Sequence, residues 1–277
     1  MGAAMARRLL GGGFALSVWN RNVRRADPLL KAGASIAASP AEAARGADAV
    51  IAMLADDEAS RAVWTGASGA LLAMDRGALA IDSSTLTVEW MRKLGRQAEA
   101  RGVSFLDAPV TGSKPHAEQG ALNFLVGGQA AAVERAAPLF AAMGRGHVHV
   151  GPTGSGALLK LINNFMCGVQ LASLGEAMAM AQRSGLDLRR TADVLAAGSP
   201  GSPIVKMVIE RMVSRDYTPN FLVPLMVKDL SYAMEAFAAE GIDLADARAA
   251  RERFREAAAA GWHEKDIAAV VEPLRRD

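Results

Sequence analysis

Hydrophobic and polar positions follow two different periodicities in the two halves of this chain. In the first half, short apolar runs predict β-strands at 14–19, 47–54, 77–81, 103–107, 122–126 and 147–150. Segments with helical composition lie among them at 1–10, 23–32 and 88–101. Strands that are apolar on both sides and alternate with helices are typical of a mostly parallel sheet covered on both faces. We therefore expect an α/β domain over residues 1–151.

The pattern changes at the glycine-rich segment 151–156, after which no strand is predicted. Residues 157–184 predict one long helix that leaves the first domain. Shorter helices, separated by single glycines, are predicted at 188–197, 203–214, 224–240, 245–259 and 265–274. The second domain, residues 152–277, is therefore expected to be all-α and built on the long interdomain helix.

Composition narrows the class of protein. The chain has 277 residues, of which 51% are hydrophobic and 22% charged, as in a globular protein with a substantial core. A net charge of +2 argues against nucleic-acid binding through a broad basic face. The single cysteine, Cys167, excludes an internal disulfide and is interpreted as a packed helix residue. No targeting or membrane segment is predicted, so a cytoplasmic protein is expected.

The first candidate site joins the start of the chain to the end of its first strand. A dinucleotide fold places phosphate at a helix N-terminus, here Met1 and Gly2, and the adenosine ribose beside the next strand. An acidic residue after that strand would select NAD, but this chain has Asn20, Arg21 and Asn22. A guanidinium suits a 2′-phosphate, so NADP(H) is expected rather than NAD(H). The alternative is that Arg21 is only a solvated charge.

Hydroxyl residues follow a second predicted strand, in the sequence Asp82-Ser83-Ser84-Thr85. Small hydroxyl residues at a strand's carboxyl end can line the ligand crevice of an α/β sheet. They can also form the N-cap of the next helix. We expect a cap that also faces the nicotinamide end of the cofactor.

A loop of small residues follows the strand at 103–107. Thr111, Gly112 and Ser113 expose hydroxyl and backbone N–H groups, which can form a nest for a carboxylate. An ordinary turn is the alternative. His116, further along this loop, is interpreted as a loop residue rather than a substrate contact.

The long predicted helix carries the last candidate site. Lys160 and Asn164 are four residues apart and share one helix face. Every other residue from 157 to 162 is apolar, so Lys160 either extends to solvent or is buried for a purpose. Burial lowers the pKa of an ammonium group and makes it usable as a general acid.

These segments together resemble the β-hydroxyacid dehydrogenase family, which includes 3-hydroxyisobutyrate dehydrogenase and relatives of 6-phosphogluconate dehydrogenase. The resemblance covers the whole chain and is most specific at 156–164, which matches the family's G-x-x-x-K-x-x-N-N helix. It implies that Lys160 is the catalytic acid/base and that Asn164 binds substrate. Residues 107–112 resemble the family's D-A-P-V-S-G loop, with Thr111 in place of the serine.

The resemblance also implies the remaining site residues. Substrate contacts are expected from Thr111, Gly112, Ser113, Asn164, Phe221 and Asp229. Cofactor contacts are expected from Met1, Gly2, Asn20, Arg21, Asn22, Met53, Leu54, Ser84, Thr85 and Lys228. The spelling of residues 111–115 is closest to the glyoxylate and succinic semialdehyde reductase branch. The family begins with a strand and G-x-G-x-M-G, whereas this chain starts at the final M-G, so the first strand and two glycines are expected to be absent.

The resemblance implies an NADPH-dependent enzyme that transfers a hydride between the nicotinamide and a small aldehyde acid or β-hydroxy acid. We expect the site in a cleft between the domains, a homodimer or homotetramer, and no metal, nucleic-acid or membrane partner. One alternative is an imine reductase, although that group usually lacks the lysine. Another is a non-catalytic oligomeric binding protein that has retained the fold.

Overall fold

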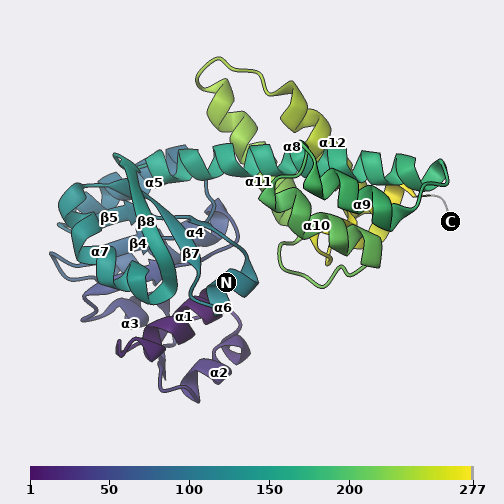
Figure 1. Cartoon of the computed structure of the whole chain (residues 1–277). Helices are drawn as coiled ribbons and strands as arrows, with labels where there is room; N and C mark the ends of the chain where they lie inside the picture. Colours follow the sequence, from purple (N-terminus) through teal and green to yellow (C-terminus); the bar gives the residue numbers. More distant parts are fainter. Residues whose placement is uncertain (276–277) are drawn as a thin grey trace. The chain divides into compact units, whose positions relative to one another are not determined.

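The computed structural model describes residues 1–275, which divide into two compact units (Figure 1). The first unit is Met1–Lys160, and the second begins at Leu161. The division falls inside one continuous helix, α8 (Ser155–Arg183). An α/β domain followed by a helical domain that starts with this long helix confirms the predicted fold class.

A six-stranded sheet forms the centre of the first unit, in the order β3-β4-β5-β7-β6, with β8 pairing with β7. The strands are β3 (Ala49–Ala52), β4 (Leu79–Asp82), β5 (Ser104–Asp107), β6 (Val110–Thr111), β7 (Leu122–Gly128) and β8 (Gly144–Gly151). β3, β4 and β5 are parallel, and β7 is antiparallel to β5 and β6. The pairing places Ala52 opposite Asp82, and Asp82 opposite Asp107. The carboxyl ends of these three strands therefore meet at one edge.

The first two strands form a separate parallel pair, β1 (Ser17–Val18) and β2 (Ser35–Ile36). Between them a short 3-10 turn (Val23–Arg25) leads into α2 (Asp27–Leu30). Pro28 lies in the first turn of α2, where its missing N–H costs no helical hydrogen bond, so this helix starts late in the predicted segment. All six predicted strands are present, and β2 and β6 are additional.

Helices cover both faces of the larger sheet. They are α1 (Gly2–Gly11), α3 (Pro40–Ala44), α4 (Asp57–Thr65), α5 (Val88–Glu99), α6 (Lys114–Glu118) and α7 (Ala130–Met143). α1 lies beside α6 and α7 (Figure 1). α3, α4, α6 and α7 were not predicted. α3 and α6 have only five residues each, α4 buries only Ser60 and Trp64, and half of α7 is alanine, with Pro138 inside the helix.

Alternate residues of the strands enter different cores. Leu79 and Ile81 of β4 pack with Leu106 and Phe124 in one buried cluster. Ala80, between them, belongs to the other cluster with Trp64, Trp90 and Phe105. This period of two, with apolar residues on both sides, is the pattern of a sheet buried on both faces.

The second unit contains the rest of α8 and the helices α9 (Leu188–Ala197), α10 (Pro203–Ser214), α11 (Val223–Ala238) and α12 (Ala245–Ala257). Its core includes Leu171, Ile209, Leu230 and Phe254. The last predicted helix, 265–274, is instead a 3-10 helix (Ile267–Leu274) that starts after Asp266 caps Ala268 N and contains Pro273. In the part of the chain that the structure describes, only α8 is long and apolar enough to cross a membrane. Buried helices of globular domains meet the same two criteria.

Candidate functional site

The carboxyl edge of β3, β4 and β5 is the place where a ligand site is expected. In α/β sheets, ligands bind outside the carboxyl ends of parallel strands. Met53 and Leu54 follow β3, and Ser84 and Thr85 follow β4. Strand register therefore brings these four candidate cofactor residues to one edge of the sheet.

Asp82, the last residue of β4, organises the loop that follows it. Its carboxylate is fully buried and accepts hydrogen bonds from Ser60 Oγ (2.9 Å), Trp64 Nε1 (2.8 Å) and Ser84 N (2.9 Å). Trp90 Nε1 in turn donates to Ser60 Oγ over 2.8 Å. Burial raises the pKa of Asp82, and the hydrogen bonds act in the opposite direction. The turn at Ser84 is thus held from inside the protein.

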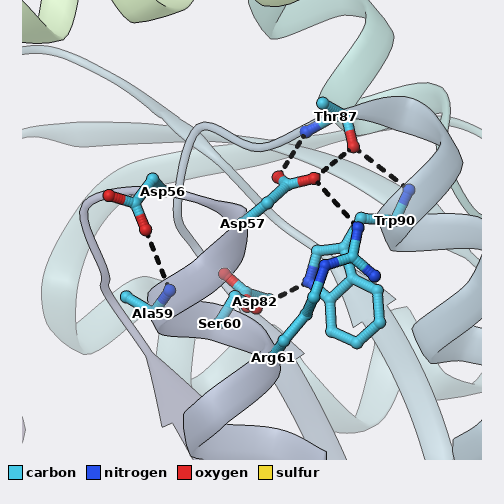
Figure 2. A network of polar contacts seen from close by, with 8 residues as sticks. All are labelled: Asp56, Asp57, Ala59, Ser60, Arg61, Asp82, Thr87 and Trp90. Atoms are coloured by element: carbon cyan, nitrogen blue, oxygen red, sulfur yellow. Dashed lines mark hydrogen bonds and ion pairs between the residues drawn. The ribbon is translucent and has the colours of Figure 1, made fainter.

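A second carboxylate holds the other end of this loop. Asp57 accepts hydrogen bonds from Thr87 N (3.0 Å) and Thr87 Oγ1 (2.6 Å), and Figure 2 shows its side chain between Thr87 and Arg61. Ser84 Oγ accepts a hydrogen bond from Leu54 N over 2.8 Å. The loops after β3 and β4 are therefore fixed to each other as well as to the core.

The prediction that the Asp82-to-Thr85 segment caps the next helix is wrong. α5 begins at Val88, and its N-cap is Thr87, whose Oγ1 accepts from Trp90 N over 3.2 Å. The Asp82 carboxylate bonds Ser84 N and two side chains of α4, and Ser84 Oγ bonds the loop after β3. These contacts hold the hydroxyl segment at the sheet edge, and Thr87, the next hydroxyl residue, caps α5 instead.

Two observations at this edge fit a dinucleotide. Ser83 Oγ, at the carboxyl end of β4, is buried and has no hydrogen-bond partner among the described residues, so it offers a polar group to a ligand. α1 begins at Gly2 without a side-chain cap, which leaves N–H groups of its first turn available to a phosphate. A Cβ built on Gly2 would lie 3.6 Å from Met53 Cβ, so this helix start faces the loop after β3.

The turn after β1 presents Arg21 to solvent. Asn20 Nδ2 donates to Asn22 O over 2.8 Å, and Asn22 Oδ1 accepts from Arg24 N over 3.2 Å. Both asparagine side chains are therefore occupied in shaping the turn. The exposed Arg21 guanidinium is the group of the three that a bound anion can meet.

The loop from Thr111 to Ser113 is shaped by His116. Gly112 has a φ of 102°, and a Cβ there would lie 2.9 Å from His116 Cβ, so the turn requires glycine. Ser113 N donates to His116 Nδ1 over 3.2 Å. One N–H of the predicted carboxylate nest is therefore already paired. His116 lies on α6 rather than in the loop where it was expected, and its ring bonds the residue that precedes this helix.

Lys160 lies on the second turn of α8 and is only 8% exposed. The helix start is bonded to β5, because the carboxylate of Asp107 accepts from Gly154 N (2.7 Å) and Ala157 N (2.8 Å). Burial is the main cause that raises the pKa of Asp107 to about 6. The buried anchoring roles of Asp107, Asp82 and Asp57 were not predicted from the sequence, where Asp82 appeared only as part of the expected helix cap. For Asp82 and Asp107 the available signal was an acidic residue that ends an otherwise apolar strand, whereas Asp57 begins α4 and carried no such signal.

In the helical unit, the structure brings together three predicted site residues. Asn164 Nδ2 donates to Asp229 Oδ2 over 2.6 Å, and Lys228 Nζ lies 3.1 Å from Asp229 Oδ1. Asn163 Nδ2 donates to Asn164 Oδ1 over 3.0 Å, which fixes the orientation of the amide. Asn164 and Asp229 are both buried, so these side chains form a polar cluster inside the helical core.

Phe221 precedes α11 and is held by Asp266. The buried Asp266 carboxylate accepts from Phe221 N and Asn220 N, each over 2.9 Å, and pairs with Arg211. The Phe221 ring packs against the core of the helical unit. No group of three His, Cys, Asp or Glu side chains within residues 1–275 is placed to hold a metal ion.

Comparison with known families divides the chain as the fold does. Residues 1–151 match the family described as the NAD binding domain of 6-phosphogluconate dehydrogenase. Residues 154–274 match the family described as NAD-binding of NADP-dependent 3-hydroxyisobutyrate dehydrogenase.

Individual relatives are similar along nearly the whole chain. The NAD-dependent L-serine dehydrogenase of Pseudomonas aeruginosa is 36% identical over 98% of this chain and 93% of its own length. The chloroplastic glyoxylate/succinic semialdehyde reductase 2 of Arabidopsis thaliana is 34% identical over 99% of this chain and 77% of its own. The solved structure of Mycobacterium tuberculosis 3-hydroxyisobutyrate dehydrogenase with L-serine superposes with a TM-score of 0.89 at 31% identity, covering 100% of this chain and 96% of that one.

Proposed function

We propose a reaction for this chain from the premise that it belongs to the β-hydroxyacid dehydrogenase family. It is a nicotinamide-dependent oxidoreductase that acts on a CH–OH group or the corresponding carbonyl. Within that class, the proposed activity is NADPH-dependent reduction of a small aldehyde acid. Lys160 is the proposed general acid.

The observation that carries the proposal is the buried ammonium group of Lys160 in an apolar helical turn. Lys160 is one helical turn from Asn164, whose amide is held by Asp229. The bound nicotinamide supplies the hydride that reduces the carbonyl carbon. As negative charge develops on the carbonyl oxygen, Lys160 Nζ transfers a proton to it and the alcohol forms.

The proposed roles of the other residues follow from their groups. Thr111, Gly112 and Ser113 bind the substrate carboxylate through the two hydroxyl groups and the backbone N–H groups other than that of Ser113, which His116 accepts. Asn164 orients the carbonyl, supported by Asp229, and Phe221 provides an apolar wall. Ser84 and Thr85 contact the nicotinamide end of the cofactor, and Lys228 is a further cofactor contact. Met53 and Leu54, together with Met1 and Gly2, line the phosphate-binding end.

Substrate choice is the first test. The spelling of residues 111–115 and the Arabidopsis relative support glyoxylate or succinic semialdehyde. The purified chain is expected to show a higher kcat/KM for one of these two than for 2-hydroxy-3-oxopropionate or 3-hydroxyisobutyrate, measured by NADPH absorbance. Clear preference for either member of the second pair would overturn this substrate assignment.

L-Serine oxidation is a second candidate function, because the Pseudomonas relative is named for it and the Mycobacterium structure contains it. In this direction Lys160 would accept the hydroxyl proton instead of donating it. The carboxylate nest would serve both reactions. Rapid NAD⁺ reduction with L-serine, and slow reduction of glyoxylate and succinic semialdehyde, would favour this alternative.

Cofactor choice depends on Arg21. NADP is supported by the exposed guanidinium after β1 and the absence of an acidic residue there. The Pseudomonas relative is NAD-dependent, and the affinities of an Arg21 variant distinguish the two cofactors for this chain. Arg21→Ala is expected to weaken NADPH binding by roughly 10–100-fold, because a hydrogen bond to a charged group contributes about 1.5–3 kcal/mol. NADH affinity should change little.

The exposed Arg145, on β8, provides the matched control, and Arg145→Ala should leave both affinities unchanged. Isothermal titration calorimetry measures the NADPH and NADH affinities of the wild type and of both variants. Equal losses for NADPH and NADH in the Arg21 variant would show that Arg21 does not contact the 2′-phosphate.

Two alternatives have direct tests. An imine reductase would turn over cyclic imines faster than aldehyde acids. A non-catalytic binding protein would show a thermal shift with NADPH but no turnover. We also propose a homodimer or homotetramer, because Met166 and Met180 on α8 are large apolar side chains that are more than half exposed.

A further inference from the structure

The carboxylate of Asp107 lies in a hole made by glycines. A Cβ on Gly127 of β7 would lie 2.5 Å from Asp107 Oδ1, and one on Gly156 would lie 2.6 Å from Asp107 O and 3.0 Å from Oδ2. Real side chains do not approach so closely, so the glycines let two backbone segments close around the carboxylate. Asp107 is fully buried there.

The same carboxylate fixes the beginning of α8. Its two oxygens each accept one N–H, Gly154 N at Oδ1 and Ala157 N at Oδ2. A helix start leaves such N–H groups without partners, and this cap reaches across 47 residues of sequence to supply them. Lys160 comes three residues after Ala157, on the adjoining turn of the same helix face.

We propose that Asp107 is a positioning residue that sets the place and orientation of Lys160 by capping the first turn of α8. The inference rests on the proposed function, because it takes Lys160 to be the general acid. A proton-transfer group must be held within hydrogen-bond distance of the substrate oxygen, and a small displacement lowers the rate strongly. Asp107 therefore acts on kcat through Lys160 without touching substrate.

Protonation of Asp107 weakens the same cap in the wild-type protein. The hydroxyl oxygen of a protonated carboxyl is a weaker acceptor than a carboxylate oxygen, so one of the two N–H bonds is weakened. The pKa of Asp107 is raised by burial to about 6. Asp82 of β4 raises that pKa through like charge. Arg92 of α5 lies against Gly154, and Lys160 is the first charged residue along α8. β7 contributes none, and Arg135 of α7 bonds Ser104 at the far end of β5.

The effect of Asp107 protonation on folding stability distinguishes a loss of Lys160 positioning from unfolding of the protein in acid. The folded pKa lies above the ordinary value of 3.8, so the native state binds this proton more tightly than the unfolded chain. The contribution of Asp107 to stability therefore rises as pH falls from about 6 toward 4. A loss of kcat over that range, with no loss of stability from this group, reports the altered cap.

The experiment is a double-mutant cycle on kcat with Asp107→Asn, Lys160→Met and the combined variant. Asparagine keeps the volume but places an NH₂ where one carboxylate oxygen accepted. Asp107→Asn is expected to lower kcat by about 10-fold with little change in KM or NADPH affinity. The double variant should match Lys160→Met alone, because Asp107 acts only through Lys160. If the kcat of the double variant instead fell by the product of the two single losses, the proposal would be overturned.

The matched control is Asp187→Asn. Asp187 also accepts two backbone N–H groups, Arg189 N and Arg190 N, but at the exposed start of α9. Its loss should leave kcat unchanged. A fall in kcat equal to that of Asp107→Asn would mean that any lost cap has this effect, and would overturn the proposal.

Two further readouts keep the inference testable if Asp107→Asn folds poorly. Wild-type kcat should fall as pH drops through about 6, and the residual rate of Lys160→Met should lack that fall. Amide exchange at Ala157, measured by NMR, should be about 10-fold faster in Asp107→Asn at neutral pH. Unchanged exchange would refute the cap itself. A near-normal kcat in Lys160→Met would instead refute the proposed function.

Discussion

Lys160→Met is expected to lower kcat by about 10²–10⁴-fold, the usual contribution of a positioned general acid. Methionine has a similar length and suits the apolar turn around position 160, so the fold and the melting temperature should be retained. The ammonium group acts when charge develops on the carbonyl oxygen, so the loss should appear in kcat more than in KM.

The control is Lys206→Met on α10, where the lysine is exposed. It should have normal kinetics. Steady-state assays with NADPH and the preferred aldehyde acid measure both variants, and calorimetry should show little change in NADPH affinity. A Lys160 variant with near-normal kcat would remove the proposed mechanism, whatever the substrate.

Asp82→Ala is expected to cost about 2–4 kcal/mol of unfolding free energy. The substitution removes the acceptor of Ser60 Oγ, Trp64 Nε1 and Ser84 N, and each buried donor left unpaired costs about 1–3 kcal/mol. Part of this loss is offset, because burial that raises the pKa of Asp82 also makes its ionised form costly. The net effect remains well above that of a surface substitution.

Asp56→Ala is the matched control, because Asp56 caps α4 at Ala59 N in the same region (Figure 2). Loss of an N-cap costs about 1 kcal/mol. Urea unfolding can be followed by tryptophan fluorescence, since Trp64 and Trp90 belong to the network. If the two variants lose equal stability, Asp82 does not hold the loops after β3 and β4 as described.

Part of the site could be predicted because it depends on neighbours in sequence. Lys160 and Asn164 share a face of α8 because helical periodicity alone places residues four apart together. The exposed turn at Arg21 follows from a polar triplet after an apolar strand. The change from an alternating α/β pattern to helices near residue 151 likewise gave the fold class.

The helix cap after β4 marks the limit of local information. Asp82, Ser83, Ser84, Thr85 and Thr87 all have side chains that can cap a helix. Only the folded chain selects Thr87, because Asp82 and Ser84 find partners in α4 and in the loop after β3. When several side chains could cap the same helix equally well, the buried donors that the fold brings beside each one determine which hydrogen bonds form.

The amino-acid sequence by itself determined the fold class, the helix that carries Lys160 and Asn164, and the family. Only the tertiary structure decided which carboxylates hold the site in place. Asp107 reaches Gly154 across 47 residues, and Asn164 reaches Asp229 across 65. A buried carboxylate must find donors, but the donors come from whichever segments the sheet and helices bring beside it. No periodicity within a single segment contains that information.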